Sequence, residues 1–439
     1  MVQGPITKIE PRIASRLSKQ RYQLVGEHGG VKVCHWTKQS LIADRSCYKG
    51  TFYGIESHGC MQMAPNVDTC NLGCTYCWRE PHSDTLHKID DDPYELYLES
   101  VRGHRRLLTG YGGNPKADRE KWLEAQNPKH VAISLNGEPT LYSRLGEFID
   151  VCHQHGTSTF LVTNGSLPKV IENLDPLPTQ LYVSVDAPNK EIFDRICKPK
   201  FDQNAFHKLE QTLEILPSLD TRTVCRHTLI KHESLGFHED YARLDNIADP
   251  DFIEAKGFVF VGNSRNNLSI ENMPSHADVM EFSEKLAPLV GREVLSERRE
   301  SRVALIGREM IPVTLPEKTR ELPAALGIAK PQNFVLPQAC TIGLLDPHSG
   351  QSCSSLLSYW WKHAGQVGEI SILPETPTEI LSSSTLSRCR TSRLNSGTSK
   401  RPGPPSCRRT SGGRVTVPES STISSLESDR SPMSTSSPC

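Results

Sequence analysis

Apolar runs of strand length alternate with amphipathic stretches through the middle of the chain. The runs are HVAISL (130–135), STFLVT (158–163), QLYVSV (180–185), RTVCRHTLI (222–230) and AKGFVFV (255–261). Apolar positions at helical spacing predict helices near residues 143–154, 189–196, 203–215, 237–247 and 275–288. Near-continuous apolar strands separated by helices are typical of a parallel sheet that helices cover.

A sixth unit precedes these five. MQMAPNV (61–67) is expected to form a strand, a Cys-rich loop follows it, and a helix is predicted from about Asp92 to Leu108. Six βα units predict an α/β fold, a partial TIM-type (βα)6 barrel with its chemistry at the C-terminal ends of the strands. Upstream, IEPRIASRLSKQ predicts one more helix, and the polar insert 109–128 is expected to hold a short helix in its second half.

The composition changes after about residue 311. Residues 312–380 are punctuated by Pro, and 18 of the 58 residues from Ser382 to the end are Ser. Such a sequence buries too little apolar surface to fold. We therefore expect an N-terminal extension (1–60), a barrel (61–311) and an irregular to disordered tail (312–439). A shifted reading frame is an alternative origin of the tail, which intact mass would test.

Charge and hydropathy narrow the functional class. Hydrophobic residues make up 36% of the chain, and no run of 18 apolar residues and no apolar leader occurs, so neither a membrane helix nor a secretory signal is expected. We expect a cytoplasmic protein whose 14 Cys are mostly free thiols. Residues 382–439 carry a net charge of +6 and the remainder −7, so a nucleic acid must be bound by a local patch.

Three Cys in the sequence CNLGCTYC have the spacing C-x3-C-x2-C: Cys70, Cys74 and Cys77. A [4Fe–4S] cluster usually takes four Cys, so three leave one iron open to the amine and carboxylate of S-adenosylmethionine. The alternative is zinc, which requires four closed ligands, typically in paired C-x2-C units. The spacing favours the cluster.

A second set of Cys lies upstream at equal intervals of 13 residues: Cys34, Cys47 and Cys60. The set is compatible with a second three-thiolate cluster, and equally with three unrelated buried Cys. Lys49 follows Cys47 by two residues. A lysine in an apolar pocket can lose its proton and form a Schiff base with a keto acid, although a lone Lys is ordinarily a solvated surface charge.

Short polar residues follow three of the predicted strands. They are Gly137 and Glu138 after the first, Asn164 after the second, and Ser184 with Asp186 at the end of the third. Each segment alone is an ordinary βα turn. Three on one rim of a barrel favour a binding site, in which Glu138 can accept a hydrogen bond from an amine.

Residues 20 to 310 resemble the archaeal type of 4-demethylwyosine synthase, a radical enzyme of tRNA wyosine biosynthesis. The resemblance rests on CYKG within the Cys34–Cys60 set, CNLGCTYCWR, GNPKADREKW, PKHVAISLNGEPTLY, FLVTNGSLP, FIEAKGFVFVGNSR and ENMPSHADV. CNLGCTYC alone marks only the superfamily. The flavodoxin-like domain of the eukaryotic relatives is absent, which implies an external donor of the flavodoxin or ferredoxin type.

The resemblance implies two [4Fe–4S] clusters, one on each Cys set, with S-adenosylmethionine bound at the cluster of Cys70. It implies that Lys49 forms a Schiff base with pyruvate and that Glu138 and Asn164 contact S-adenosylmethionine. The implied substrate is N1-methylguanosine beside the anticodon of tRNA(Phe), and the product is 4-demethylwyosine. The base must leave its stack to reach a barrel interior.

Several assignments stay open at this point. Candidate tRNA contacts are Arg79, His104, Arg105, Arg106, Lys116, Lys121, Arg298 and Arg299. Cys152, Cys197 and Cys225 are expected to be buried structural thiols, and Arg226 either faces a substrate carboxylate or pairs with a core acid. Another radical enzyme with a different substrate and a zinc-stabilised RNA-binding module are the competing interpretations.

Overall fold

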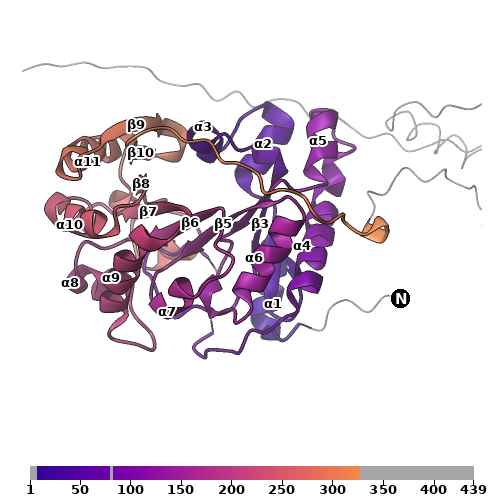
Figure 1. The fold of residues 1–439 in the computed structure, drawn as a ribbon, viewed down its shortest axis with the longest axis horizontal. Coiled ribbons are helices and arrows are strands. Elements are labelled where there is room, and N and C mark those ends of the chain that lie inside the picture. Colours follow the sequence, from indigo (N-terminus) through magenta and orange to yellow (C-terminus); the bar gives the residue numbers. More distant parts are fainter. Residues whose placement is uncertain (1–6, 80–82, 327–439) are drawn as a thin grey trace, which may run out of the picture. The chain divides into compact units, whose positions relative to one another are not determined.

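A computed structural model describes residues 7–79 and 83–326 (Figure 1). These residues contain a ten-stranded sheet in the order β1-β2-β3-β4-β5-β6-β7-β8-β10-β9. The strands are β1 (Gln23–Val25), β2 (Gly29–Lys32), β3 (Cys60–Ala64), β4 (His130–Ile133), β5 (Ser158–Thr163), β6 (Gln180–Ser184), β7 (Arg222–Leu229), β8 (Phe252–Gly257), β9 (Glu293–Arg298) and β10 (Val303–Gly307).

The six strands from β3 to β8 are parallel and lie side by side in chain order. Each matches one of the six expected βα units, which confirms the α/β partial barrel. Antiparallel strands extend this core at both ends: β2 pairs with β3, and β10 pairs with β8. The sheet thus contains more strands than the six that the apolar pattern predicts.

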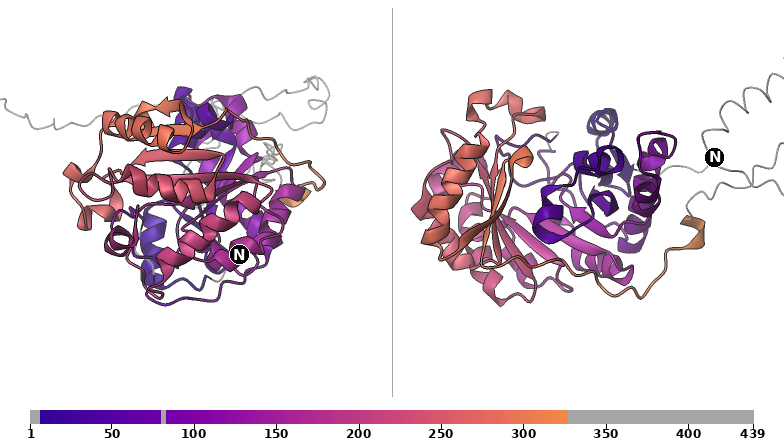
Figure 2. Two further views of the ribbon diagram at one scale, coloured as in Figure 1. Left: turned by 60° about the vertical axis from the view of Figure 1, so that its left-hand side comes forward. Right: turned by 90° about the horizontal axis from the view of Figure 1, so that it is seen from above.

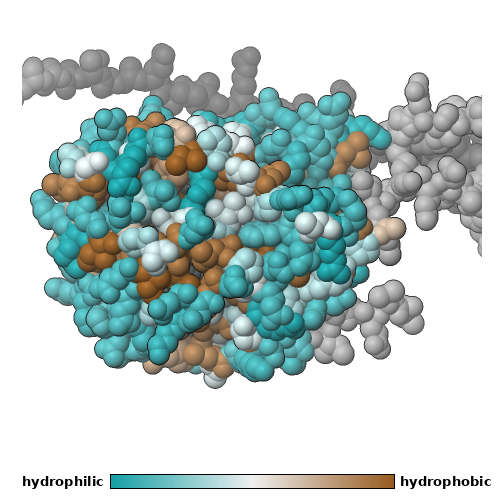
Figure 3. Space-filling view, viewed as in Figure 1, coloured by the Kyte–Doolittle hydropathy of each residue, from teal (hydrophilic) through white to brown (hydrophobic). Residues whose placement is uncertain are grey.

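Helices pack along the outer face of the parallel strands (Figures 1 and 2). The α-helices are α1 (Pro11–Lys19), α2 (His35–Ala43), α3 (Tyr48–Tyr53), α4 (Pro93–Leu108), α5 (Arg119–Ala125), α6 (Leu145–Gln154), α7 (Pro168–Glu172), α8 (Lys190–Ile196), α9 (Ala205–Ile215), α10 (His238–Ala248) and α11 (His276–Leu289). On the face drawn in Figure 3, hydrophilic residues predominate, with apolar residues visible between them near the middle. Within the described residues, no helix combines the length and apolar character that crossing a bilayer requires.

The inner face of the sheet is filled in part by α3. Phe52 and Tyr53 are buried in one apolar cluster with Phe160 of β5, Tyr182 of β6 and Phe252 of β8. The Tyr53 and Phe252 rings meet edge to face with centroids 5.3 Å apart. The segment before β3 therefore supplies core residues to the barrel interior, and it brings Cys47 and Lys49 with it.

Two parts of the prediction are wrong in detail. The last parallel strand begins at Phe252 and not at Ala255, because the buried Glu254 interrupts its apolar run. The sequence pattern also missed β1, β2, α2, α3, α7, β9 and β10, which are short or not continuously apolar. The predicted tail lies outside the described residues from 327 onward, and the three domain boundaries stay predictions.

Candidate active site

A cavity of about 440 Å³ opens on the inner face of the parallel strands. Its volume falls in the range of small-molecule sites. All twelve site residues expected from the sequence line it: Cys34, Cys47, Lys49, Cys60, Cys70, Cys74, Cys77, Gly137, Glu138, Asn164, Ser184 and Asp186. The structure thus brings together residues that are up to 152 positions apart in the chain, while their roles stay predictions.

The loop of Cys70, Cys74 and Cys77 is held by backbone contacts with the last residue of α8 and the two residues after it. The Gly73 amide donates to the carbonyl oxygens of Cys197 (3.1 Å) and Lys198 (2.9 Å), and the Thr75 amide donates to Ile196 (2.8 Å). Because these bonds fix the main chain on both sides of Cys74, the loop is ordered by the barrel.

Tyr76 ties the same loop to the end of β6. Its hydroxyl donates to Asp186 Oδ2 at 2.6 Å, and the Thr228 amide donates to Asp186 Oδ1 at 2.8 Å. The buried Cys197 lies 3.7 Å from the Tyr76 hydroxyl and also lines the cavity. Cys152, Cys197 and Cys225 are all buried thiols, as expected. Cys197 is, however, part of the cavity wall, which its helical sequence context does not indicate.

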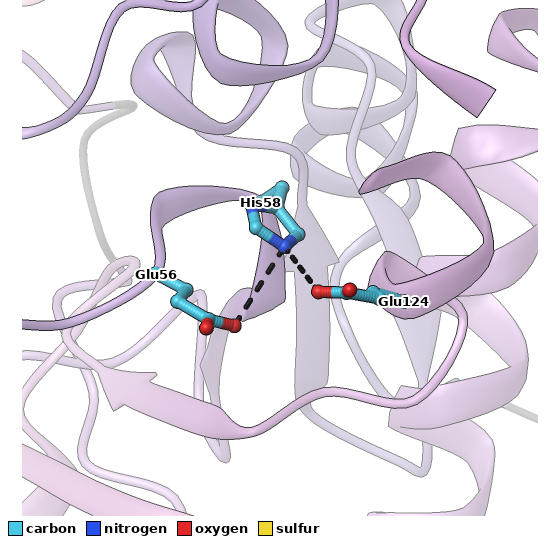
Figure 4. A group of neighbouring side chains, drawn as sticks. All are labelled: Glu56, His58 and Glu124. Carbon is cyan, nitrogen blue, oxygen red and sulfur yellow. Dashed lines mark hydrogen bonds and ion pairs between the residues drawn. The ribbon is translucent and has the colours of Figure 1, made fainter. Parts of the chain in front are cut away.

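Thiol spacing distinguishes a cluster from a mononuclear metal site. Zinc–sulfur bonds of about 2.3 Å put tetrahedral sulfurs about 3.8 Å apart. Among the His, Cys, Asp and Glu residues of 7–79 and 83–326, one trio alone has its ligand atoms within 4.8 Å of one another: Glu56, His58 and Glu124 (Figure 4). In each Cys triplet at least two of the sulfurs therefore lie more than 4.8 Å apart, which is compatible with thiols that each bind a separate iron.

The trio in Figure 4 is a charge-paired surface group. His58 Nε2 lies 2.8 Å from Glu124 and 3.7 Å from Glu56. Lys129 Nζ pairs with both carboxylates, at 2.5 Å from Glu56 and 3.5 Å from Glu124. Ion pairs with Lys129 and the contact with His58 therefore already engage both carboxylates without a metal ion.

The upstream Cys set surrounds the other side of the cavity. Cys34 directly precedes α2, Cys47 directly precedes α3, and Cys60 begins β3. Burial, together with the charge of Cys34, raises the pKa of Cys47 to about 11 and that of Cys60 to about 12. Thiols in this state need a nearby cation, such as a metal ion, to become thiolates.

Lys49 lies among aromatic rings. Its Nζ is 4.2 Å from the ring centroid of Tyr182 and 4.7 Å from that of Phe160. Burial lowers its pKa, although the nearby Glu254 and Cys47 oppose that shift. Lys49 is therefore not the solvated surface charge that a lone lysine usually is.

Gly137 and Glu138 form a constrained turn after β4. Gly137 has φ +68°, and a Cβ there would lie 2.1 Å from the Asn66 carbonyl oxygen, so no other residue fits. Glu138 Oε1 accepts hydrogen bonds from both the amide and the hydroxyl of Thr140 and from the hydroxyl of Thr163, and Oε2 accepts one from the Asn164 amide at 2.8 Å. The carboxylate is held rigidly, and Oε2 retains capacity for another donor.

Asn164 also takes part in a polar network. Its Nδ2 donates to Asn71 Oδ1 at 2.8 Å, and its Oδ1 accepts from the Ser166 amide at 3.0 Å. Ser184 stands beside Arg226 in the register of β6 and β7. These contacts join the strand ends to the Cys loop, which places both in one rigid frame.

The sequence analysis missed a buried carboxylate next to the cavity wall. Glu254 accepts hydrogen bonds from the hydroxyls of Tyr48 (3.1 Å) and Tyr53 (2.8 Å). Arg226 and Lys256 line the cavity beside it. The predicted start of β8 at Ala255 left Glu254 outside the strand, and the alternation of inward positions on β7 and β8 was the signal that would have found the group.

The candidate tRNA contacts differ in their exposure to solvent. His104 is wholly buried and cannot touch a tRNA, which corrects that assignment. Arg79 is buried and donates to the Tyr22 hydroxyl at 3.1 Å, and Arg105 Nε donates to the Gln126 carbonyl at 2.6 Å. Trp78 was not expected, yet it is 46% exposed and lines the cavity. Exposed basic candidates are Arg106, Lys116 and Arg299.

The sequence matches two family models and several relatives. Residues 67–244 match the radical SAM superfamily, and residues 247–308 match the wyosine base formation family. The chain is 46% identical over 304 residues to an S-adenosyl-L-methionine-dependent tRNA 4-demethylwyosine synthase of Pyrococcus abyssi, covering 68% of this chain and 89% of that one. It is 38% identical over 306 residues to the mouse (Mus musculus) enzyme of that name, TYW1, covering 69% of this chain and 42% of that one.

The fold is also similar to that of a solved structure. The structure of TYW1 with a lysine-pyruvate adduct bound is similar with a TM-score of 0.62 and 36% identity, over 68% of this chain and 96% of that chain. The likeness thus extends over nearly the whole of that structure.

Proposed function

The chain belongs to the tRNA 4-demethylwyosine synthases, which are radical S-adenosylmethionine enzymes, and from this premise we propose the substrates and the residue roles. The proposed reaction condenses N1-methylguanosine of tRNA(Phe), 3′ of the anticodon, with pyruvate to give 4-demethylwyosine. One observation carries the proposal: both Cys triplets and Lys49 line the same cavity.

The donor set fits two clusters. Cys70, Cys74 and Cys77 would hold the cluster at which S-adenosylmethionine binds, and Cys34, Cys47 and Cys60 would hold an auxiliary [4Fe–4S] cluster. When bound, the first cluster and S-adenosylmethionine supply a 5′-deoxyadenosyl radical. The protein holds the Cys loop still through the Gly73 and Thr75 amides, and Glu138 Oε2 is placed to accept a hydrogen bond from the ligand.

Lys49 is the residue proposed to bind pyruvate covalently. Its amine attacks the keto carbon, the carbonyl oxygen leaves as water, and an imine remains. The burial of Lys49 lowers its pKa and so favours the neutral amine that this attack needs. The lysine–pyruvate adduct in the TYW1 structure supports this role.

The target base must enter the cavity from its mouth. Trp78 offers an exposed aromatic face on the cavity wall, and Arg79 stacks on its ring at 3.7 Å from the centroid. An unstacked base is commonly received by such a face. The barrel interior then excludes water around the reacting methyl group.

The clusters need an external source of electrons and a reducing environment. Free site thiols suit a reducing compartment such as the cytoplasm. A separate flavodoxin- or ferredoxin-type carrier would reduce the clusters.

The tRNA is proposed to bind at exposed basic side chains. The exposed candidates are Arg106, Lys116 and Arg299.

The test is an isotope experiment. Reduced, cluster-loaded protein is incubated with S-adenosylmethionine, fully ¹³C-labelled pyruvate and tRNA(Phe) that carries N1-methylguanosine. Mass analysis of the nucleosides should show 4-demethylwyosine that retains two labelled carbons, because the carboxyl carbon is lost. Formation of 5′-deoxyadenosine without a mass change in the tRNA would contradict the proposed substrates.

A further inference from the structure

Besides Arg79, which donates to the Tyr22 hydroxyl, three cations line the cavity and have no ion-pair partner in the described part of the chain. They are Lys49, Arg226 and Lys256, and among the described residues no carboxylate oxygen lies within 4.0 Å of their nitrogens. Lys256 Nζ has one hydrogen bond, of 3.3 Å, to the Ser301 carbonyl. Within the same part of the chain, the Arg226 Nε is buried and has no hydrogen-bond partner.

The nearby carboxylates are already occupied. Glu254 stands beside Arg226 in the register of β7 and β8, yet it accepts from Tyr48 and Tyr53. Asp186 accepts from Tyr76 and from the Thr228 amide. Because the buried Arg226 Nε has no hydrogen-bond acceptor and no carboxylate pairs directly with the guanidinium, an anion is expected to bind there in the cavity.

We infer that Arg226, with Lys256 beside it, binds the carboxylate of the α-keto acid whose carbonyl group reacts with Lys49, an inference that rests on the proposed function. In pyruvate the carboxylate is bonded directly to the keto carbon. An imine at Lys49 therefore places the carboxylate next to that lysine, in the cavity that Arg226 and Lys256 also line.

The chemistry of the two side chains fits this ligand. A guanidinium presents a planar pair of donors that matches a carboxylate, and an ammonium adds a second positive charge. Arg226 projects from the inner face of β7, and Lys256 lies one pleat further along the inner face of β8. Both come from strands, which position a ligand more rigidly than loops do.

Another arginine on the same strand provides a matched control. Arg222 lies on the same face of β7, four residues before Arg226, but outside the cavity lining. Its guanidinium lies over the rings of Tyr53 and Phe252, at 5.3 Å from each centroid. Arg222→Gln therefore removes a similar charge from the same strand without touching the proposed anion site.

The experiment measures KM for pyruvate in the cluster-loaded enzyme with methylated tRNA. Arg226→Gln should raise that KM about 100-fold, the effect of losing a charge-assisted hydrogen-bonded pair. Arg226→Lys should recover part of the loss, Lys256→Gln should raise KM less, and Arg222→Gln should leave it near the wild-type value. The wild type should also use pyruvate at least about 30-fold better than the uncharged pyruvamide, which tests the anion site without any variant.

The outcomes separate the competing explanations. An unchanged pyruvate KM in Arg226→Gln, or equal use of pyruvate and pyruvamide by the wild type, overturns the inference while the proposed function stands. A weaker affinity for S-adenosylmethionine with unchanged pyruvate KM also overturns it, because the bound carboxylate is then that of the methionine. If the wild type makes no pyruvate-dependent product, the proposed function fails as well.

Discussion

The hydroxyl of Tyr76 donates a hydrogen bond of 2.6 Å to the carboxylate of Asp186. This bond joins the Cys loop to the C-terminal end of β6, where Asp186 also accepts from the Thr228 amide. The position of the Cys loop is thereby coupled to two neighbouring parallel strands, which is how the barrel holds the site together.

Removing this hydroxyl should weaken catalysis without preventing cluster binding. Tyr76→Phe loses a hydrogen bond to a charged group, so we expect about tenfold slower cleavage of S-adenosylmethionine. The rate of 5′-deoxyadenosine formation and the iron content per chain measure the two effects. Tyr94→Phe on α4, whose ring packs against His155 outside the cavity, is the control. Equal rates for both variants would show that the Tyr76–Asp186 bond does not position the loop.

Gly137→Ala should destabilise the turn before Glu138. The added Cβ meets the Asn66 carbonyl oxygen, and alanine disfavours φ +68°. We expect a loss of at least about 2 kcal/mol in the free energy of unfolding, measured with urea. Gly113→Ala is the control, since nothing lies within 4 Å of a Cβ at that exposed position. Similar unfolding midpoints for both variants would contradict the strained geometry of the turn.

Lys49→Gln should abolish the pyruvate adduct. Borohydride reduces a lysine imine to a stable amine, so mass analysis of wild-type peptides should locate a modification at Lys49. Lys32→Gln is a stringent control, because burial also lowers the pKa of Lys32, to about 8, yet Lys32 lies outside the cavity lining. An equal adduct in Lys49→Gln and wild type would remove Lys49 from the mechanism.

The buried His104 predicts a pH dependence of stability. Burial lowers its pKa to about 4 from an ordinary value of 6.5. A depressed folded-state pKa gives stability that is complete above pH 6.5 and is lost as pH falls toward 4. Between pH 7.5 and pH 5.5 we expect this residue to cost the wild type about 1 kcal/mol. Urea unfolding of His104→Gln should show a correspondingly smaller change, and identical pH dependence in both proteins would refute the prediction.

The sequence predicted the six parallel units because their strands are apolar on both faces. It also predicted the site at the strand ends, since parallel strands bring their carboxyl ends to one rim. It failed where side chains depend on distant partners. The hydroxyls of Tyr48 and Tyr53 satisfy the buried carboxylate of Glu254 inside its strand, and His104 is buried by packing that no local charge pattern reveals. Short elements such as α3 likewise depend on the barrel core for their stability.

The most direct test of the central claim measures iron and S-adenosylmethionine cleavage in two triple variants. One replaces Cys70, Cys74 and Cys77 with Ala, and the other replaces Cys34, Cys47 and Cys60. After anaerobic reconstitution, wild type should hold about eight iron atoms per chain and each variant about four. Cleavage should disappear in the first variant and persist in the second. Continued cleavage without Cys70, Cys74 and Cys77 would contradict the assignment of this triplet to the S-adenosylmethionine site.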